Sequence, residues 1–182
     1  EGAPDEAELA AYLKENATGF VMRRNDWSYA CNYECESYNV GFFCDATPAS
    51  VTTTSGSPNG HNYGFTLRNC EVGVRVSAAS GAGIMFTRIS TPGCQTGFEL
   101  TDGVQGPINL YSCDLEGTEN GVLTTSTCGS PLHLTACRVK GNVNILGGHF
   151  HHNVYGGGYE GTVYGSVYVN IGREAIRNAS VL

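Results

Sequence analysis

Carboxylates are the side chains of this chain best suited to acid–base chemistry. Asp45 stands shortly before a long polar segment, residues 47–62, and Asp102 lies in a turn before Gly103. Two neighbouring carboxyl groups can act as general acid and general base, which is the arrangement that hydrolyses glycosidic bonds. We predict Asp45 and Asp102 as the catalytic pair. The alternative for Asp102 is an ordinary turn role, because Asp before Gly is a common turn sequence.

Neutral polar and aromatic side chains are the ones that would hold a ligand. Asn and His form directional hydrogen bonds, and an aromatic ring can pack against an apolar ligand surface. We predict these substrate-binding residues: Trp27, His61, Asn109, Tyr111, His133 and His149. The alternatives are that the polar members are ordinary solvated residues and that Trp27 fills the joint between a helix and the first coil. His149, His151 and His152 cluster without an obvious further ligand, so we predict no metal site.

A repeat of 24 residues predicts the elements that position these side chains. Gly73, Gly97 and Gly121 recur at this spacing, and the apolar residues between them fall into columns. The columns are Val74, Phe98 and Val122; Val76 and Leu100; Ile84, Ile108 and Leu132; Phe86, Leu110 and Leu134; and Ile89, Cys113 and Cys137. Repeats of roughly 20–50 residues are typical of solenoids, and short apolar–polar alternation between turn residues indicates strands. We therefore predict an all-β parallel β-helix.

Charged residues give an independent check on this alignment. It places three pairs of opposite charge on neighbouring coils: Arg75 with Glu99, Asp114 with Arg138, and Glu116 with Lys140. Neighbouring strands lie ~4.8 Å apart, so the members of each pair are expected to meet. Asp26, Asp45 and Asp102 have no basic partner in the same alignment. We therefore look for the catalytic carboxylates among these three.

Composition narrows the classes of partner. The chain has 182 residues, 25 glycines, a net charge of −7 and 15% charged residues. No basic patch is available to neutralise phosphates, which argues against nucleic acid, and no apolar run is long enough to span a membrane. We predict no cofactor. Of the eight cysteines, Cys70, Cys113 and Cys137 fall in inward positions, where we expect small apolar behaviour. Disulfides remain open for the others: Cys31, Cys35, Cys44, Cys94 and Cys128.

The chain divides into a short helical start and a long β-helix. Residues 4–15 predict a helix, with Pro4 and acidic residues at its beginning and Leu9, Tyr12 and Leu13 on one face. We assign residues 1–18 to an N-terminal cap over the first coil and residues 19–182 to the β-helix. We expect residues 47–62 to project as a loop. The repeat fades after Gly147 without a closing cap, so we expect a segment of a longer β-helix, or a partner polypeptide or second copy at the C-terminal end.

The stretches from Ala17 to Tyr29 and from Tyr38 to Phe42, together with the coil pattern, resemble the pectate-lyase-like right-handed β-helix superfamily. Within it, the chain is most similar to bacterial glycan-degrading enzymes, and the resemblance covers residues 17–150. It implies a right-handed β-helix, a carbohydrate ligand and a secreted or cell-surface location. The superfamily holds lyases, hydrolases and phage tailspikes, and one fold hosts many functions.

The expected function is therefore that of a carbohydrate-active enzyme domain that acts on a poly- or oligosaccharide. Hydrolysis is favoured over lyase chemistry, because a pectin lyase would need basic residues for uronates and several aspartates for calcium. The alternative is a non-catalytic glycan-binding or structural β-helix, such as a tailspike or adhesin module or one part of a split enzyme.

Overall fold

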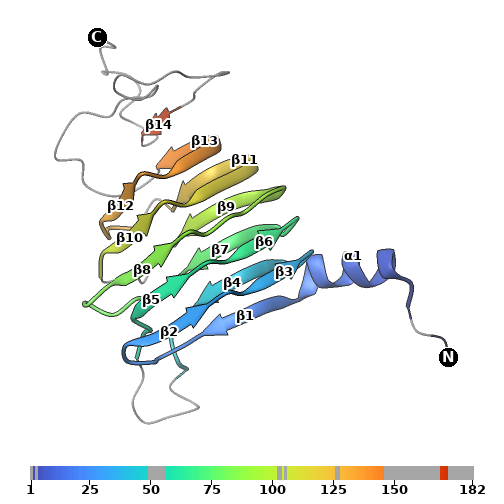
Figure 1. The fold of residues 1–182 in the computed structure, drawn as a ribbon, viewed down its shortest axis with the longest axis horizontal. Coiled ribbons are helices and arrows are strands. Elements are labelled where there is room, and N and C mark those ends of the chain that lie inside the picture. The colour runs from blue at the N-terminus through green and yellow to red at the C-terminus, as the bar shows by residue number, and fades with distance from the viewer. Residues whose placement is uncertain are drawn as a thin grey trace.

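The computed structural model of the protein describes residues 2, 4–48, 56–101, 104, 106–125, 128–145 and 169–171. These residues form a parallel β-solenoid with a period of ~24 residues and one N-terminal helix, α1 (Glu6–Asn16) (Figure 1). All strand pairs among them are parallel, as the repeat predicts.

The strands of successive coils stack into three sheets. The seven-stranded sheet contains β1 (Thr18–Met22), β4 (Val40–Cys44), β7 (Val72–Val76), β9 (Cys94–Leu100), β11 (Asp114–Thr124), β13 (Arg138–Ile145) and β14 (Val169–Ile171). The five-stranded sheet contains β2 (Ser28–Cys31), β5 (Gly60–Tyr63), β8 (Ile84–Thr87), β10 (Ile108–Tyr111) and β12 (Leu132–Thr135). The two-stranded sheet contains β3 (Glu34–Glu36) and β6 (Thr66–Arg68).

The register of the strands confirms the predicted columns. Val74 pairs with Phe98, which pairs with Val122, and Ile84 pairs with Ile108, which pairs with Leu132. All three predicted charge pairs are also present: Arg75 with Glu99, Arg138 with Asp114, and Lys140 with Glu116. The outward charges therefore follow the same register as the core.

Aromatic residues fill the interior of the early coils. Phe42, Phe65, Phe86 and Phe98 are fully buried, and the ring centroids of Phe42 and Phe65 lie 4.7 Å apart. Phe86 meets Phe42 and Phe98 edge to face, a favourable arrangement for the ring quadrupoles. The interior is therefore packed with side chains, and a ligand site must lie on an outer surface.

A left-handed residue follows every strand of the five-stranded sheet. These residues are Asn32, Gly64, Arg88, Ser112 and Ala136, with φ between 52° and 70°. Only one of them is glycine, although a side chain in this conformation costs on the order of 1 kcal/mol. The repeated corner ends every strand of the sheet at the same point, so that its outer residues line up from coil to coil.

Two expectations about the N-terminal half need correction. The helix exists, with Asp5 accepting a hydrogen bond from the Glu8 N–H at 2.7 Å, but none of its residues is buried. It extends away from the stack (Figure 1), and only its last turn is anchored, by the Asn39 N–H donating to the Leu13 carbonyl. It therefore does not cover the first coil, where Phe20 stays 40% exposed. The expected loop over residues 47–62 is also too long, because β5 begins at Gly60.

All eight cysteines are free thiols. Those in the core are Cys44, Cys70, Cys94, Cys113 and Cys128, while Cys137 is half-buried and Cys31 is exposed. The expectation that buried cysteines act as small apolar residues is therefore confirmed for Cys70 and Cys113. It also holds for three cysteines for which the sequence left a disulfide possible: Cys44, Cys94 and Cys128. Burial raises the pKa of Cys44, and it raises the pKa of Cys113 to about 11, because a thiolate is poorly solvated in an apolar interior.

We predict that the fold loses stability in base through these thiols. The folded-state pKa of Cys113 lies above the ordinary value of 9.0, so its contribution is complete below pH 9 and is lost as the pH rises through about 11. Two pKa units at about 1.4 kcal/mol each make the full loss for this thiol on the order of 3 kcal/mol. Urea unfolding from pH 8 to 11 measures it. Cys113→Ala should flatten the fall of the unfolding free energy with pH, whereas Cys31→Ala should leave it unchanged. Equal slopes in the two variants would contradict the assignment to Cys113.

Asn62 is a polar residue in the apolar interior. It is 1% exposed, and its neighbours in the column are Ala30 and Phe86. Neither its amide nitrogen nor its carbonyl oxygen has a hydrogen-bond partner. A buried amide without a partner costs about 1–3 kcal/mol, so this position weakens the second coil.

We predict that Asn62→Leu stabilises the protein by about 1–2 kcal/mol, because it removes the unpartnered amide and fills the space with apolar atoms. Chemical unfolding measures the change. Asn62→Asp, which would bury a charge at the same position, should destabilise the protein. Destabilisation by the leucine variant would mean that the amide has a partner in solution.

Candidate functional site

The outer face of the five-stranded sheet brings four of the predicted binding residues together. Tyr29, His61, Met85, Asn109 and His133 occupy one row across the strands, each in register with the next. The neighbouring row contains Tyr63, Thr87, Tyr111 and Thr135. His61, Asn109, Tyr111 and His133 thus lie on one face, Trp27 lies at its edge, and His149 lies outside the described residues.

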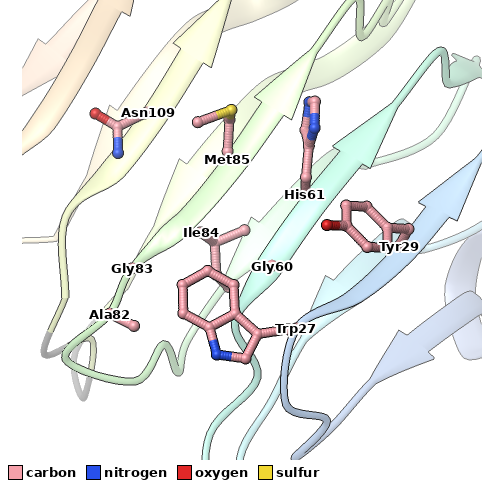
Figure 2. Close-up of a pocket in the computed structure, with 9 residues that line it drawn as sticks. All are labelled: Trp27, Tyr29, Gly60, His61, Ala82, Gly83, Ile84, Met85 and Asn109. Carbon is pink, nitrogen blue, oxygen red and sulfur yellow. The ribbon is translucent and has the colours of Figure 1, made fainter.

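A pocket of about 190 Å³ opens at one end of this face. Figure 2 shows its lining, which consists of Trp27, Tyr29, Gly60, His61, Ala82, Gly83, Ile84, Met85 and Asn109. Its volume lies below the usual range of ligand pockets, about 300–1,000 Å³. The pocket can hold part of an elongated ligand, with the remainder lying along the sheet.

Two glycines keep the base of the pocket open. Gly60 is the first residue of β5, and Gly83 directly precedes β8. Their φ angles are 118° and 80°, a backbone conformation in which a residue with a side chain is strained. A Cβ atom would lie 2.2 Å from the Ser28 carbonyl oxygen at Gly60, and 2.3 Å from the Pro107 carbonyl oxygen at Gly83. Close backbone approach therefore requires glycine here, and neither residue adds a side chain to the pocket that it lines.

Trp27 presents its indole to solvent. The residue has a left-handed φ of 57°, and its backbone N–H donates to the side-chain Oδ1 of buried Asn59 at 2.5 Å. The side chain is 68% exposed and lines the pocket (Figure 2). The alternative in which Trp27 fills the joint with the helix is therefore wrong. Strained backbone at an exposed aromatic residue is typical of functional sites.

Contacts among the outer side chains hold His61 in place. Its Nε2 hydrogen-bonds with the Thr87 Oγ1 at 2.9 Å, and its ring meets Tyr29 and Tyr63 edge to face at centroid distances of 6.5 and 6.4 Å. Arg88 donates to the Tyr63 hydroxyl at 2.9 Å and lies over the ring of Tyr63. The imidazole and the two tyrosines are thus ordered before any ligand binds.

The strands of this face and the lining of the pocket are uncharged, and the Arg88 guanidinium lies at the corner after β8, over the Tyr63 ring. None of the five strands that form the face contains Asp, Glu, Lys or Arg, and none of the residues that line the pocket is charged. Within the described part of the chain, no cluster of three or more His, Cys, Asp or Glu residues is arranged to hold a metal ion. The geometry suits a neutral ligand with both apolar surfaces and hydrogen-bonding groups.

Asp45 has a structural environment. It follows β4 of the seven-stranded sheet, accepts hydrogen bonds from the Ala46 N–H at 2.8 Å and the Ser77 hydroxyl at 3.4 Å, and pairs with Arg23 at 3.5 Å. Asp26 pairs with Arg24 at 3.9 Å. The expectation that these aspartates lack basic partners is wrong, because Arg23 and Asp45 are 22 residues apart in a shorter early coil, so a 24-residue alignment misses the pair.

The predicted catalytic pair stays a prediction, because only one of its members is among the described residues. Asp102 lies outside them, and Asp45 does not line the pocket. Sequence reasoning also missed Tyr29 and Met85. The sequence pattern could have indicated both residues. Tyr29 lies two residues after Trp27, the spacing of side chains on one face of a strand, and Met85 lies one 24-residue period before Asn109.

The chain matches no protein-family model, no curated protein and no solved structure. No helix of the described part of the chain is long and apolar enough to cross a membrane. Fold and site together define a parallel β-solenoid with an uncharged, aromatic face on one of its sheets.

We predict that the Asp45 ion pair contributes modestly to stability. Asp45→Asn should lower the free energy of unfolding by less than about 1 kcal/mol, because Arg23 is half exposed and water screens the pair. Asp26→Asn, at a longer and more exposed ion pair, should have no measurable effect. Urea titrations at low and high salt measure both. An equal cost for the two variants would contradict this ranking.

Proposed function

We propose that this β-solenoid binds a neutral oligo- or polysaccharide along the outer face of its five-stranded sheet. The observation that carries the proposal is the uncharged pocket whose lining includes the exposed rings of Trp27 and Tyr29. Sugar rings present C–H surfaces that pack on aromatic rings, and their hydroxyl groups require donors and acceptors such as His61 and Asn109. This chemistry fits the lining of the pocket.

The exposure of the two rings supports the same conclusion. Trp27 is 68% and Tyr29 76% exposed, although both carry large apolar surfaces. Grouped exposed apolar residues, rimmed by polar ones, commonly mark binding sites. The rows of register-matched residues beyond the pocket provide further polar contacts for an elongated ligand, from Asn109 to His133 and from Tyr111 to Thr135.

Binding is favoured over cleavage. Hydrolysis of a glycan requires two carboxyl groups at the bond, and the described lining of the pocket contributes none. We therefore propose the non-catalytic glycan-binding alternative for this face. The hydrolase expected from the resemblance stays a prediction that depends on Asp45 and Asp102.

We predict saturable binding of at least one neutral glycan. Trp27 is the only tryptophan in the chain, so its emission reports on the pocket directly. Titration with cello-, xylo-, manno- and malto-oligosaccharides should change this emission, and polygalacturonate should not. Loss of one aromatic contact, about 0.5–1.5 kcal/mol, predicts that Tyr29→Ala weakens binding about 2- to 13-fold.

Tyr12 provides the matched control. It is an exposed tyrosine on α1, at 63%, far from the five-stranded sheet (Figure 1), so Tyr12→Ala should bind like the unmodified protein. Tightest binding to polygalacturonate, or equal losses in the two tyrosine variants, would contradict the proposal. Release of reducing ends from the neutral glycans, if Asp45→Asn or Asp102→Asn abolished it, would instead support the hydrolase hypothesis.

A further inference from the structure

Two apolar surfaces at the N-terminal end of the solenoid are left uncovered by the described residues. The first is the open end of the first coil, where Phe20 stacks on Phe42 with ring centroids 5.2 Å apart and remains 40% exposed. The second is the face of α1 that contains Leu9 and Tyr12, which are 45% and 63% exposed. Exposed apolar residues that gather at one end of a molecule commonly mark an interface with another chain.

The connection between the two surfaces prevents them from meeting within one chain. Only Ala17 separates α1 from β1, and its backbone is extended, with φ of −115° and ψ of 147°. Asn39 fixes the last turn of the helix: its backbone N–H donates to the Leu13 carbonyl at 3.0 Å, and its side-chain amide donates to the Lys14 carbonyl at 3.2 Å. A helix held in this way does not turn back over its own first coil, and it extends away from the stack (Figure 1).

We propose that two copies of this chain form a symmetric dimer in which α1 of each copy covers the first coil of the other. The same contact then occurs twice, as in any twofold interface. A covering helix is one of the ways in which natural proteins protect the unpaired edge of a sheet, here the edge formed by β1. The proposal is independent of glycan binding, because no residue of α1 or β1 lines the pocket.

The dimensions of the two elements match. α1 has 11 residues, which span ~16 Å at ~1.5 Å per residue. β1 has five residues, which also span ~16 Å at ~3.3 Å per residue. A twofold axis close to Ala17, where the helix meets the strand, therefore places α1 of one copy along the whole of β1 of the other. The two elements then run in opposite directions, with Leu9 and Tyr12 against the partner's Phe20.

The charges at the ends of this arrangement are complementary. The first turn of α1 contains Glu6 and Glu8, and β1 is followed directly by Arg23 and Arg24. Because helix and strand run in opposite directions, the acidic turn of one copy lies next to the two arginines of the other. Both arginines form an ion pair within their own chain, but their side chains are 47% and 41% exposed. A guanidinium has five N–H donors, so each can bind a further carboxylate.

Sedimentation velocity of the protein at micromolar concentration tests the proposal. We expect a dimer, and Leu9→Ala should raise its dissociation constant about 100-fold, which is roughly tenfold for each of the two identical contacts. No residue of α1 is buried, so the solenoid of this variant should stay folded, which circular dichroism verifies. A monomer, an open-ended assembly, or a dimer that Leu9→Ala leaves unchanged would overturn the proposal.

Leu134 provides the matched control. It is a leucine of similar exposure, 40%, on β12 at the other end of the five-stranded sheet. Leu134→Ala should therefore leave the dissociation constant of the dimer unchanged. If Leu134→Ala weakened the dimer as much as Leu9→Ala does, the interface would lie elsewhere and the proposal would fail.

A charge exchange tests the orientation of the helix. Glu6→Arg should weaken the dimer, because it places a positive charge next to the partner's Arg23 and Arg24. Adding Arg24→Glu to the same chain should recover part of the lost affinity, since opposite charges then meet again across the interface. A double variant that dimerises no better than Glu6→Arg alone would rule out this arrangement.

Discussion

The parallel hydrogen bonding of each coil to the next is the interaction on which the rest of this structure depends. It places every residue ~4.8 Å from its counterpart in the neighbouring coil, so that like residues stack on like. Inside, this produces the apolar columns and the line of phenylalanine rings from Phe42 to Phe98. Outside, it produces the ladder of charge pairs, such as Arg75 with Glu99. Each coil is stabilised only by its neighbours, so a defect in one coil, such as Asn62, weakens its contacts with both.

The same constraint shapes the candidate site. A strand alternates between inward and outward residues, so each strand of the five-stranded sheet contributes its outer residues to the same two rows. The left-handed corner after each strand keeps these rows aligned. The glycines at positions 60 and 83, which the close approach of neighbouring backbones requires, open the pocket beside Trp27 and Tyr29. A neutral, aromatic binding face thus arises from the repeat and from a few departures from it.

The thiols illustrate how one residue type takes different roles in a solenoid. Cys44 and Cys113 behave as small apolar residues, because burial disfavours their thiolates. Cys35 and Cys70 come from positions that are not equivalent in the repeat, and both sulfurs would lie 3.3 Å from a Cβ atom at Gly41, which leaves that position to glycine.

The sequence by itself determined the coil architecture, the register and the outward position of Asn109, Tyr111 and His133, whereas it placed His61 in a loop. It could do so because a period of 24 residues fixes which side chains point inward or outward and which residues lie next to each other on neighbouring coils. Only the tertiary structure decided how the irregular early coils fit together. Their spacing departs from the period, which hid the ion pair of Asp45 with Arg23. The structure also decided that α1 extends away from the first coil and that Trp27 faces the pocket. These features depend on contacts between segments of unequal length, which no periodic alignment describes.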